Sequence, residues 1–261
     1  MSGKRIGVTG AAGRVGREVL GAFDEDPHGV VPYTHSDSAD VDGETVDVTD
    51  AEAVLETIDD VDAVVHLAGA ASPAADWDAV LRVNVRGTKN VLDAVVENGI
   101  DRFVFASSNH VVGTYNAADP ADPERMTADP ARTIHPEAPP RPDSFYGVSK
   151  VACEGLTSFY ADRHGLEVVN LRIGWYMTEA ELRDSAGDDT EPARARFARA
   201  TWLSPRDCRD VHNKAAMADL PATPLTLNAV SRNDGRVHSI TETMRAIGYE
   251  PRDDAAEAIA G

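Results

Sequence analysis

Residues 5–16 read Arg5-Ile-Gly-Val-Thr-Gly-Ala-Ala-Gly-Arg-Val-Gly16, and this stretch decides the fold. A short apolar run typical of a buried strand leads into three glycines, after which apolar residues recur at helical spacing. Glycines let the chain turn tightly and let a pyrophosphate approach the backbone, while the helix N-terminus offers N–H donors. The pattern predicts a dinucleotide site; the alternative is a glycine-rich turn that binds nothing.

Apolar strands and amphipathic helices alternate along the rest of the first two thirds of the chain. We expect strands at 30–31, 45–49, 61–67, 103–106 and 166–171, and helices at 81–95 and 146–163. This alternation predicts an α/β fold, a doubly wound parallel sheet of Rossmann type covered on both faces. The second helix is expected to bury an apolar stripe made of Val148, Val151, Ala152, Phe159 and Tyr160.

Two segments depart from this alternation. Residues 114–142 lack periodicity, and we expect a long surface loop there. The pattern also loosens after about residue 175. We therefore place a dinucleotide-binding core at 1–175 and a small, mainly substrate-covering part, interleaved with the core, at 176–261.

The chain is strongly acidic. Its 261 residues carry 44 acidic and 25 basic groups, a net charge of −19, and only four of the bases are lysine. Such a surface repels nucleic acids and anionic membranes. Acidic, lysine-poor, alanine-rich composition resembles proteins of salt-accumulating microbes; an ordinary acidic enzyme is the alternative.

Composition also bounds location and metal content. No apolar run approaches the roughly 20 residues that span a bilayer, and no signal-peptide pattern is present, so we expect a cytoplasmic protein. Two cysteines and eight scattered histidines show no metal-ligand spacing, and we expect no metal site.

A second motif, Tyr146-Gly-Val-Ser-Lys150, supplies chemistry. Its tyrosine and lysine lie one helical turn apart, and an ammonium near a phenol favours the phenolate. The phenolate can take a proton from a hydroxyl while a nicotinamide takes hydride from the same carbon. Ser108, just after the strand at 103–106, is placed to hydrogen-bond the same oxygen. With the glycine turn, these residues indicate nicotinamide-dependent oxidation of an alcohol or hemiacetal.

From about residue 4 to residue 175 the chain resembles the extended short-chain dehydrogenases. The motifs that carry the resemblance are Thr9-Gly-Ala-Ala-Gly-Arg-Val-Gly16, His66-Leu-Ala-Gly69, Asn84, Phe105-Ala-Ser-Ser-Asn-His110, Tyr146-Gly-Val-Ser-Lys150 and Arg172-Ile-Gly174. Within that superfamily, the Ser-Asn-His block and Arg172-Ile-Gly174 are similar to uronate dehydrogenases and to haloarchaeal NAD-dependent glucose-6-phosphate dehydrogenases.

The resemblance implies a role for each matching residue. The catalytic set is Ser108, Tyr146 and Lys150. Expected at the cofactor are Gly10, Gly13, Arg14, Val15, Gly16, His35, Asp47, Val48, Leu67, Ala68, Gly69, Asn84 and Ile173, with Asn84 steadying the central strands. Expected at the substrate are Ser72, Asn109, His110, Trp175, Arg196 and Arg199. His110 as an ordinary buried histidine, and Asp47 as a solvated turn residue, are the alternatives.

Two positions depart from the uronate dehydrogenase pattern. Trp175 stands where a serine follows the Ile-Gly pair, and Phe197 stands where an arginine binds the uronate carboxylate. The pocket is therefore expected to suit a sugar without a C6 carboxylate. Arg194, Arg196 and Arg199 are suited to a 6-phosphate, because guanidinium groups bind phosphate through paired hydrogen bonds. Helix-face arginines paired with neighbouring acids are the alternative.

The sequence leaves the cofactor's 2′ group open. Asp37 is suited to the ribose hydroxyls of NAD, whereas Arg14 and His35 are suited to the 2′-phosphate of NADP. We expect NAD.

We expect oxidation of glucose 6-phosphate at C1 to 6-phosphogluconolactone. The alternatives are a uronate dehydrogenase, a nucleotide-sugar epimerase or dehydratase, and a dinucleotide sensor without turnover. By resemblance we expect a homo-oligomer that pairs through the helices at 81–95 and 146–163.

Overall fold

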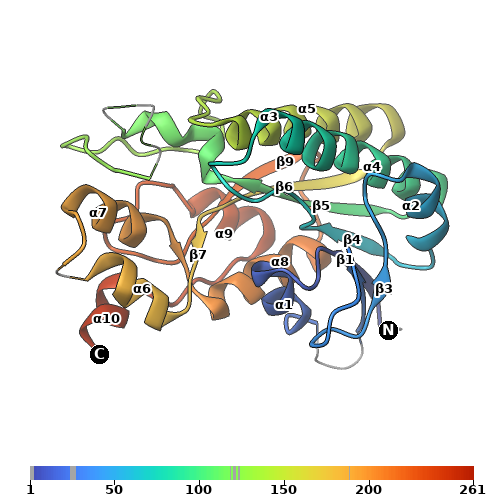
Figure 1. The fold of residues 1–261 in the computed structure, drawn as a ribbon, viewed down its shortest axis with the longest axis horizontal. Coiled ribbons are helices and arrows are strands. Elements are labelled where there is room, and N and C mark those ends of the chain that lie inside the picture. The colour runs from blue at the N-terminus through green and yellow to red at the C-terminus, as the bar shows by residue number, and fades with distance from the viewer. Residues whose placement is uncertain (1–2, 24–27, 118, 120–121, 123, 188) are drawn as a thin grey trace.

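A computed structural model describes residues 3–23, 28–117, 119, 122, 124–187 and 189–261 (Figure 1). Its centre is a seven-stranded sheet in the order β3-β2-β1-β4-β5-β6-β9, with every pair parallel. The strands are β1 (Arg5–Thr9), β2 (Gly29–Thr34), β3 (Glu44–Thr45), β4 (Ala63–His66), β5 (Arg102–Ser108), β6 (Glu167–Ile173) and β9 (Leu225–Ala229). The predicted doubly wound parallel sheet is confirmed. The strand order reverses between β1 and β4, where such sheets open a crevice for ligands.

Helices cover both faces of the sheet (Figure 1). One face carries α2 (Ala51–Thr57), α4 (Gly87–Glu97) and α5 (Phe145–His164); the other carries α1 (Arg14–Leu20), α8 (Pro205–Met217) and α9 (Thr241–Ile247). Successive strand residues feed the two cores alternately: Val64 packs towards α2, α4 and α5, and Val65 towards α1 and α8. Both faces are therefore apolar and covered, and sheets of this kind bind ligands at the carboxyl ends of their strands.

Two glycines are required where β1 turns into α1. Gly10 has a φ of +68°, a left-handed conformation that side chains disfavour. A Cβ on Gly16 would lie 2.2 Å from the Gly10 carbonyl oxygen. The turn therefore closes against the helix only because neither position carries a side chain.

The sequence-based elements differ from the structure in several places, three of which bear on the main sheet and the helix before β5. The strand expected at 45–49 is wrong beyond Thr45, because Asp47 accepts a hydrogen bond from the Thr49 amide and turns the chain towards α2. The helix expected at 81–95 begins earlier and changes type along its length: α3 (Trp77–Ala79), a π-helix η1 (Val80–Arg86) and then α4. Strand β9 was not anticipated.

The apolar stripe expected on α5 is wrong in part. Val148 is 38 % exposed and Phe159 is 53 % exposed. The buried face of α5 instead carries Lys150, Cys153 and Glu154 among others. The polar groups can be buried because they have partners: Lys150 donates to the Ala106 carbonyl, and Glu154 accepts from Arg172.

The C-terminal part contributes both to the sheet and to a cap beside it (Figure 1). Strand β7 (Trp175–Tyr176) pairs with β8 (Trp202–Leu203), and α6 (Glu179–Ala186), α7 (Pro192–Thr201) and α10 (Ala255–Ala260) pack nearby around Met177, Leu182 and Trp202. Helix α8 and strand β9 return to the main sheet. The division at residue 175 stays a prediction.

The segment expected to be a surface loop, 114–142, forms no long element in its described residues. It nevertheless buries Met126 and Ile134 in a small cluster with Val111 and Phe197. Some of the expected loop lies outside the described residues. No described helix is long and apolar enough to cross a membrane.

Candidate active site

A cavity of about 820 Å³ runs along the carboxyl ends of the central strands. Its volume falls in the range of roughly 300–1,000 Å³ of small-molecule and cofactor sites. The sequence-predicted residues that line it are Gly10, Gly13, Arg14, Val15, Gly16, His35, Asp47, Val48, Leu67, Ala68, Gly69, Ser108, Tyr146, Lys150, Ile173 and Trp175. Six other predicted residues do not line it: Ser72, Asn84, Asn109, His110, Arg196 and Arg199.

The glycine-turn end of the cavity fits a dinucleotide pyrophosphate. Gly13 caps α1 without a side-chain hydrogen bond, so the first N–H groups of the helix are left for a ligand. A Cβ on Gly10 would lie 2.7 Å from the Ala68 amide nitrogen. The bare turn therefore packs against the loop after β4 and keeps the crevice narrow.

The adenosine end holds groups of both signs. Asp37 and His35 both line the cavity and are exposed. Arg14 is already paired, through its Nη2, with Glu181 Oε1 at 2.6 Å. The arginine suited to a 2′-phosphate is thus held by α6, whereas Asp37 accepts a long hydrogen bond of 3.4 Å from the Thr45 hydroxyl.

Asp47 is an ionised turn residue at the same end. The Thr49 amide donates to its carboxylate at 2.9 Å, and this bond holds the pKa of Asp47 below its usual value. Asp47 also lines the cavity. Its carboxylate therefore stabilises the turn and also lies where it can contact a ligand.

Lys150 and Tyr146 lie together at the other end. Lys150 is buried, and its Nζ donates to the Ala106 carbonyl at 2.6 Å. The same nitrogen lies 5.5 Å from the centre of the Tyr146 ring. Ser108 is the last residue of β5, so its hydroxyl reaches the cavity from the strand edge. Helix α5 and strand β5 thus bring the three predicted catalytic residues to one cavity.

Asn84 lies behind the cavity wall. Its Oδ1 accepts from the Ala70 amide at 2.7 Å, and its Nδ2 donates to the Ser149 hydroxyl at 2.8 Å. It therefore joins the loop after β4 to helix α5 from within the π-helix η1, a distortion often found at functional sites.

The arginines of α7 do not line the cavity, and each is engaged with another group. Arg194 pairs with Glu124 at 2.6 Å, while Arg196 donates to the Ala128 carbonyl and Arg199 to the Ala186 carbonyl. The alternative of a paired helix-face arginine thus describes Arg194. Ser72 is exposed and accepts a hydrogen bond from the Ala74 amide. A sugar contact by Ser72, Arg196 or Arg199 stays a prediction.

A row of rings begins at Tyr146. The ring centres of Tyr146 and His110 are 5.8 Å apart, those of His110 and Phe197 6.4 Å, and those of Phe197 and Trp175 6.0 Å. Trp175 itself lines the cavity. Tyr146 at one end of this row and Trp175 at the other thus line the cavity, whereas His110 and Phe197 lie buried between them.

Residues 6–180 match the NAD dependent epimerase/dehydratase family. The chain belongs to this family. It is 51 % identical over 255 residues to L-arabinose 1-dehydrogenase (NAD(P)(+)) of Haloferax volcanii, which covers 98 % of this chain and 99 % of that protein. It is 38 % identical to the NAD-dependent glucose-6-phosphate dehydrogenase of the same organism, covering 96 % of this chain and 94 % of that one.

A solved relative agrees with these matches. The structure of uronate dehydrogenase from Agrobacterium tumefaciens superposes with a TM-score of 0.76 at 28 % identity, covering 100 % of this chain and 90 % of that one. The expected family, its NAD dependence and its enzymatic nature are confirmed. The resemblances to uronate and glucose-6-phosphate dehydrogenases are confirmed as well.

In this member of the epimerase/dehydratase family, sequence reasoning missed two buried acids. Glu154 lies one turn after Lys150 on the same face of α5, so its i, i+4 spacing would have revealed it. Asp143 lies three residues before Tyr146, outside the helix. Its partner, His110, is 33 positions away in the sequence. No local pattern marks it.

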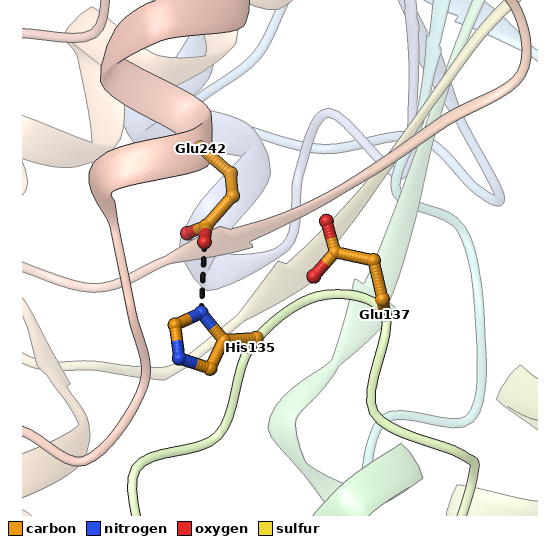
Figure 2. A group of neighbouring side chains, drawn as sticks. All are labelled: His135, Glu137 and Glu242. Atoms are coloured by element: carbon orange, nitrogen blue, oxygen red, sulfur yellow. Dashed lines mark hydrogen bonds and ion pairs between the residues drawn. The ribbon is translucent and has the colours of Figure 1, made fainter.

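Within the part of the chain that the structure describes, the sequence also showed no sign of one cluster of a histidine and two glutamates, residue types that can bind a metal ion. Figure 2 shows His135 and Glu137 on one loop facing Glu242 of α9, with potential ligand atoms within 4.8 Å of one another. His135 Nδ1 and Glu242 Oε1 are 2.8 Å apart. Burial opposes ionisation of Glu242, yet hydrogen bonds from Ser239 and His135 hold its pKa below the usual value. This contact fastens the loop at residues 131–138 to α9.

Proposed function

We propose that this NAD-dependent sugar dehydrogenase oxidises the C1 hydroxyl of a neutral aldopyranose, with L-arabinose as the best-supported substrate. The proposal is supported by the Haloferax volcanii relative named for that reaction. It is also supported by the side chains beside the predicted catalytic residues.

Three side chains would carry the proton chemistry. The Tyr146 oxygen accepts the proton of the C1 hydroxyl, because the Lys150 ammonium lies 5.5 Å from the ring and stabilises negative charge on the phenol. The Ser108 hydroxyl hydrogen-bonds the same sugar oxygen and holds it in place. Bound NAD supplies the hydride acceptor. Removal of the C1 hydrogen as hydride and of the hydroxyl hydrogen as a proton yields the lactone.

The observation that best supports a neutral substrate is the row of aromatic rings that ends at Trp175 in the cavity wall. Phe197, next to Trp175, stands at the position where an arginine is expected in uronate dehydrogenases. Aromatic rings suit the apolar C–H face of a sugar and offer nothing to a carboxylate. The flanking Arg196 and Arg199 are hydrogen-bonded to backbone carbonyls.

Glucose 6-phosphate, the finer expectation from the sequence, is the second candidate. The Arg194 guanidinium lies 5.2 Å from the centre of the Trp175 ring, and Trp175 lines the cavity. A sugar phosphate that displaced Glu124 from Arg194 would find a cation there. The glucose-6-phosphate dehydrogenase relative supports this alternative.

Steady-state NADH formation from a matched sugar panel tests the proposal. The panel is L-arabinose, D-galactose, glucose 6-phosphate, glucuronate and galacturonate, each with NAD and with NADP. We expect the highest kcat/KM for L-arabinose, with D-galactose, which adds only a hydroxymethyl group to the same ring configuration, as the matched comparison. A higher kcat/KM for the phosphate ester or for a uronate would refute the neutral assignment.

A further inference from the structure

Asp143 and His110 form a buried pair beside the catalytic tyrosine. His110 Nδ1 lies 2.9 Å from Asp143 Oδ2 and 3.1 Å from Oδ1. The Asp143 side chain is fully buried, and that of His110 is 9 % exposed. The His110 ring meets the Tyr146 ring edge-on at 5.8 Å. A buried carboxylate is costly unless it is paired, and here the imidazole supplies the pairing.

The backbone is shaped to bring these two residues together. His110 lies in the 3₁₀ helix η2 (Asn109–Tyr115), which follows β5, and Asp143 directly precedes the cap of α5. A Cβ on Gly113 would lie 1.6 Å from Asp143 Oδ2. A Cβ on Gly147 would lie 2.5 Å from the His110 carbonyl oxygen. Two glycines thus let the carboxylate and the catalytic helix close on η2.

Helix capping does not account for the Asp143 carboxylate. Ser144 is the N-cap of α5, and its hydroxyl oxygen accepts from the Gly147 amide at 3.1 Å. The Ser144 hydroxyl also donates to Asp143 Oδ1 at 2.9 Å. Both carboxylate oxygens therefore face the imidazole, and one of them is steadied by the cap.

The pair fixes which ring nitrogen of His110 is free. A carboxylate accepts, so Nδ1 carries the proton, and Nε2 of the neutral ring is left as an acceptor. In the described part of the chain Nε2 has no hydrogen-bond partner, and it is not among the atoms sealed from solvent. An open acceptor thus lies in the residue that packs against Tyr146.

We propose that Asp143 is a positioning residue that holds His110 in the Nδ1–H form, so that Nε2 accepts a hydrogen bond from a hydroxyl of the sugar. This inference rests on the proposed function, because it requires a sugar beside Tyr146. Asp143 itself touches no substrate; it acts through His110 alone.

A double-mutant cycle tests whether Asp143 acts through His110. The proteins are wild type, Asp143→Asn, His110→Ala and the double variant, each assayed for kcat and KM with the best sugar of the panel. Asn keeps the shape of Asp143 but can present an amide N–H to Nδ1, which favours the other tautomer. We expect Asp143→Asn to lower kcat/KM by about 10–100-fold, the range seen when partners that orient a histidine are removed. The same change is expected to have no effect when residue 110 is alanine.

NAD affinity and the thermal midpoint should stay near wild type in Asp143→Asn, since the pair lies outside the nucleotide cavity. An equal loss of kcat/KM with histidine or with alanine at 110 would show an independent structural role and overturn the proposal. Unchanged kcat/KM in Asp143→Asn would also overturn it.

A readout without substrate separates this inference from the proposed function. The ¹⁵N shifts of the His110 ring, assigned by loss of the signal in His110→Ala and measured at alkaline pH, report the tautomer directly. We expect Nδ1–H in wild type and a shift towards Nε2–H in Asp143→Asn. Nε2–H in wild type would overturn the role of Asp143 even if the enzyme oxidised L-arabinose. Nδ1–H in a protein that oxidised no sugar would leave Asp143 as the residue that sets the tautomer and would refute the proposed function alone.

Discussion

Arg172 and Glu154 form a buried, two-pronged ion pair behind the active site. Nε to Oε1 and Nη2 to Oε2 both measure 2.9 Å. Ser107 of β5 also donates to Glu154, and the third guanidinium nitrogen of Arg172 donates to the Pro136 carbonyl. The arginine of the Arg172-Ile-Gly174 motif therefore joins β6, β5, α5 and the 131–138 loop. These contacts give Arg172 a structural role beside α5.

Breaking this pair should be strongly destabilising. Glu154→Ala leaves the Arg172 guanidinium, whose side chain is 4 % exposed, without its partner, and we expect a loss of about 3–5 kcal/mol in the free energy of unfolding. The exposed pair Arg183–Glu179 is the control, and Glu179→Ala should change stability by no more than about 1 kcal/mol. Urea denaturation measures both. Equal losses in the two variants would contradict the assignment.

Removing the phenolic oxygen should abolish chemistry and spare binding. For Tyr146→Phe we expect kcat/KM to fall by about 10²–10⁴-fold, the usual contribution of a positioned general base. NAD titration followed by protein fluorescence should give an unchanged Kd. Tyr115→Phe removes a hydroxyl whose hydrogen bond in the described part of the chain is to the Pro139 carbonyl, and it should keep nearly full activity. Normal turnover in Tyr146→Phe would refute the role of Tyr146 as the general base. NAD binding without turnover of any sugar, in wild type and variant alike, would support the dinucleotide-sensor alternative.

The features that the sequence predicted well are those written within a few residues. The turn from Gly10 to Gly16 needs bare backbone, and Tyr146 and Lys150 sit one helical turn apart, so both constraints appear as short spacings. The sheet followed from the same kind of local evidence. Alternating apolar strands and helices admit few arrangements other than a covered parallel sheet.

Features made by distant residues left no such trace. Asp143 and His110 are 33 positions apart, and His135 meets Glu242 across 107 positions. The short third strand was overpredicted because Val46 and Val48 are buried, as strand residues are, while Asp47 turns the chain. The prediction that the apolar stripe of α5 is buried was wrong in part. Apolar spacing along a helix does not tell whether that side of the helix packs against the sheet or stays on the surface.

The exposed apolar side chains of α5 lead us to expect self-association. Phe145, Val148 and Phe159 are exposed there, and Trp77 and Leu81 are exposed on the adjoining α3 and η1. The Trp77 and Phe145 rings touch at 5.7 Å, so the two helices form one apolar surface. We expect a homodimer through this surface. Leu81→Asp should halve the mass measured by light scattering, whereas Leu55→Asp, an equally exposed apolar position on α2, should not. A monomeric wild-type protein would refute the interface.

Acid should destabilise the fold through three buried histidines. Burial lowers the pKa of His66 to about 3 and the pKa values of His212 and His238 to about 4; the charge of Arg172 adds to the effect at His238. The unfolded chain takes up these protons near pH 6.5, whereas the folded chain does not. Stability is therefore fully present above about pH 6.5 and is lost as the pH falls towards 4.

His238 is the site at which to measure this loss, because neither of its ring nitrogens has a hydrogen-bond partner in the described structure. Each such histidine contributes a slope of about 1.4 kcal/mol per pH unit to the free energy of unfolding. His238→Asn should remove that slope between about pH 6 and pH 5 in urea titrations, because asparagine takes up no proton in either state. His164→Asn, at an exposed position, should leave the slope unchanged. If both variants kept the wild-type slope, His238 would have to be protonated in the folded protein despite its burial.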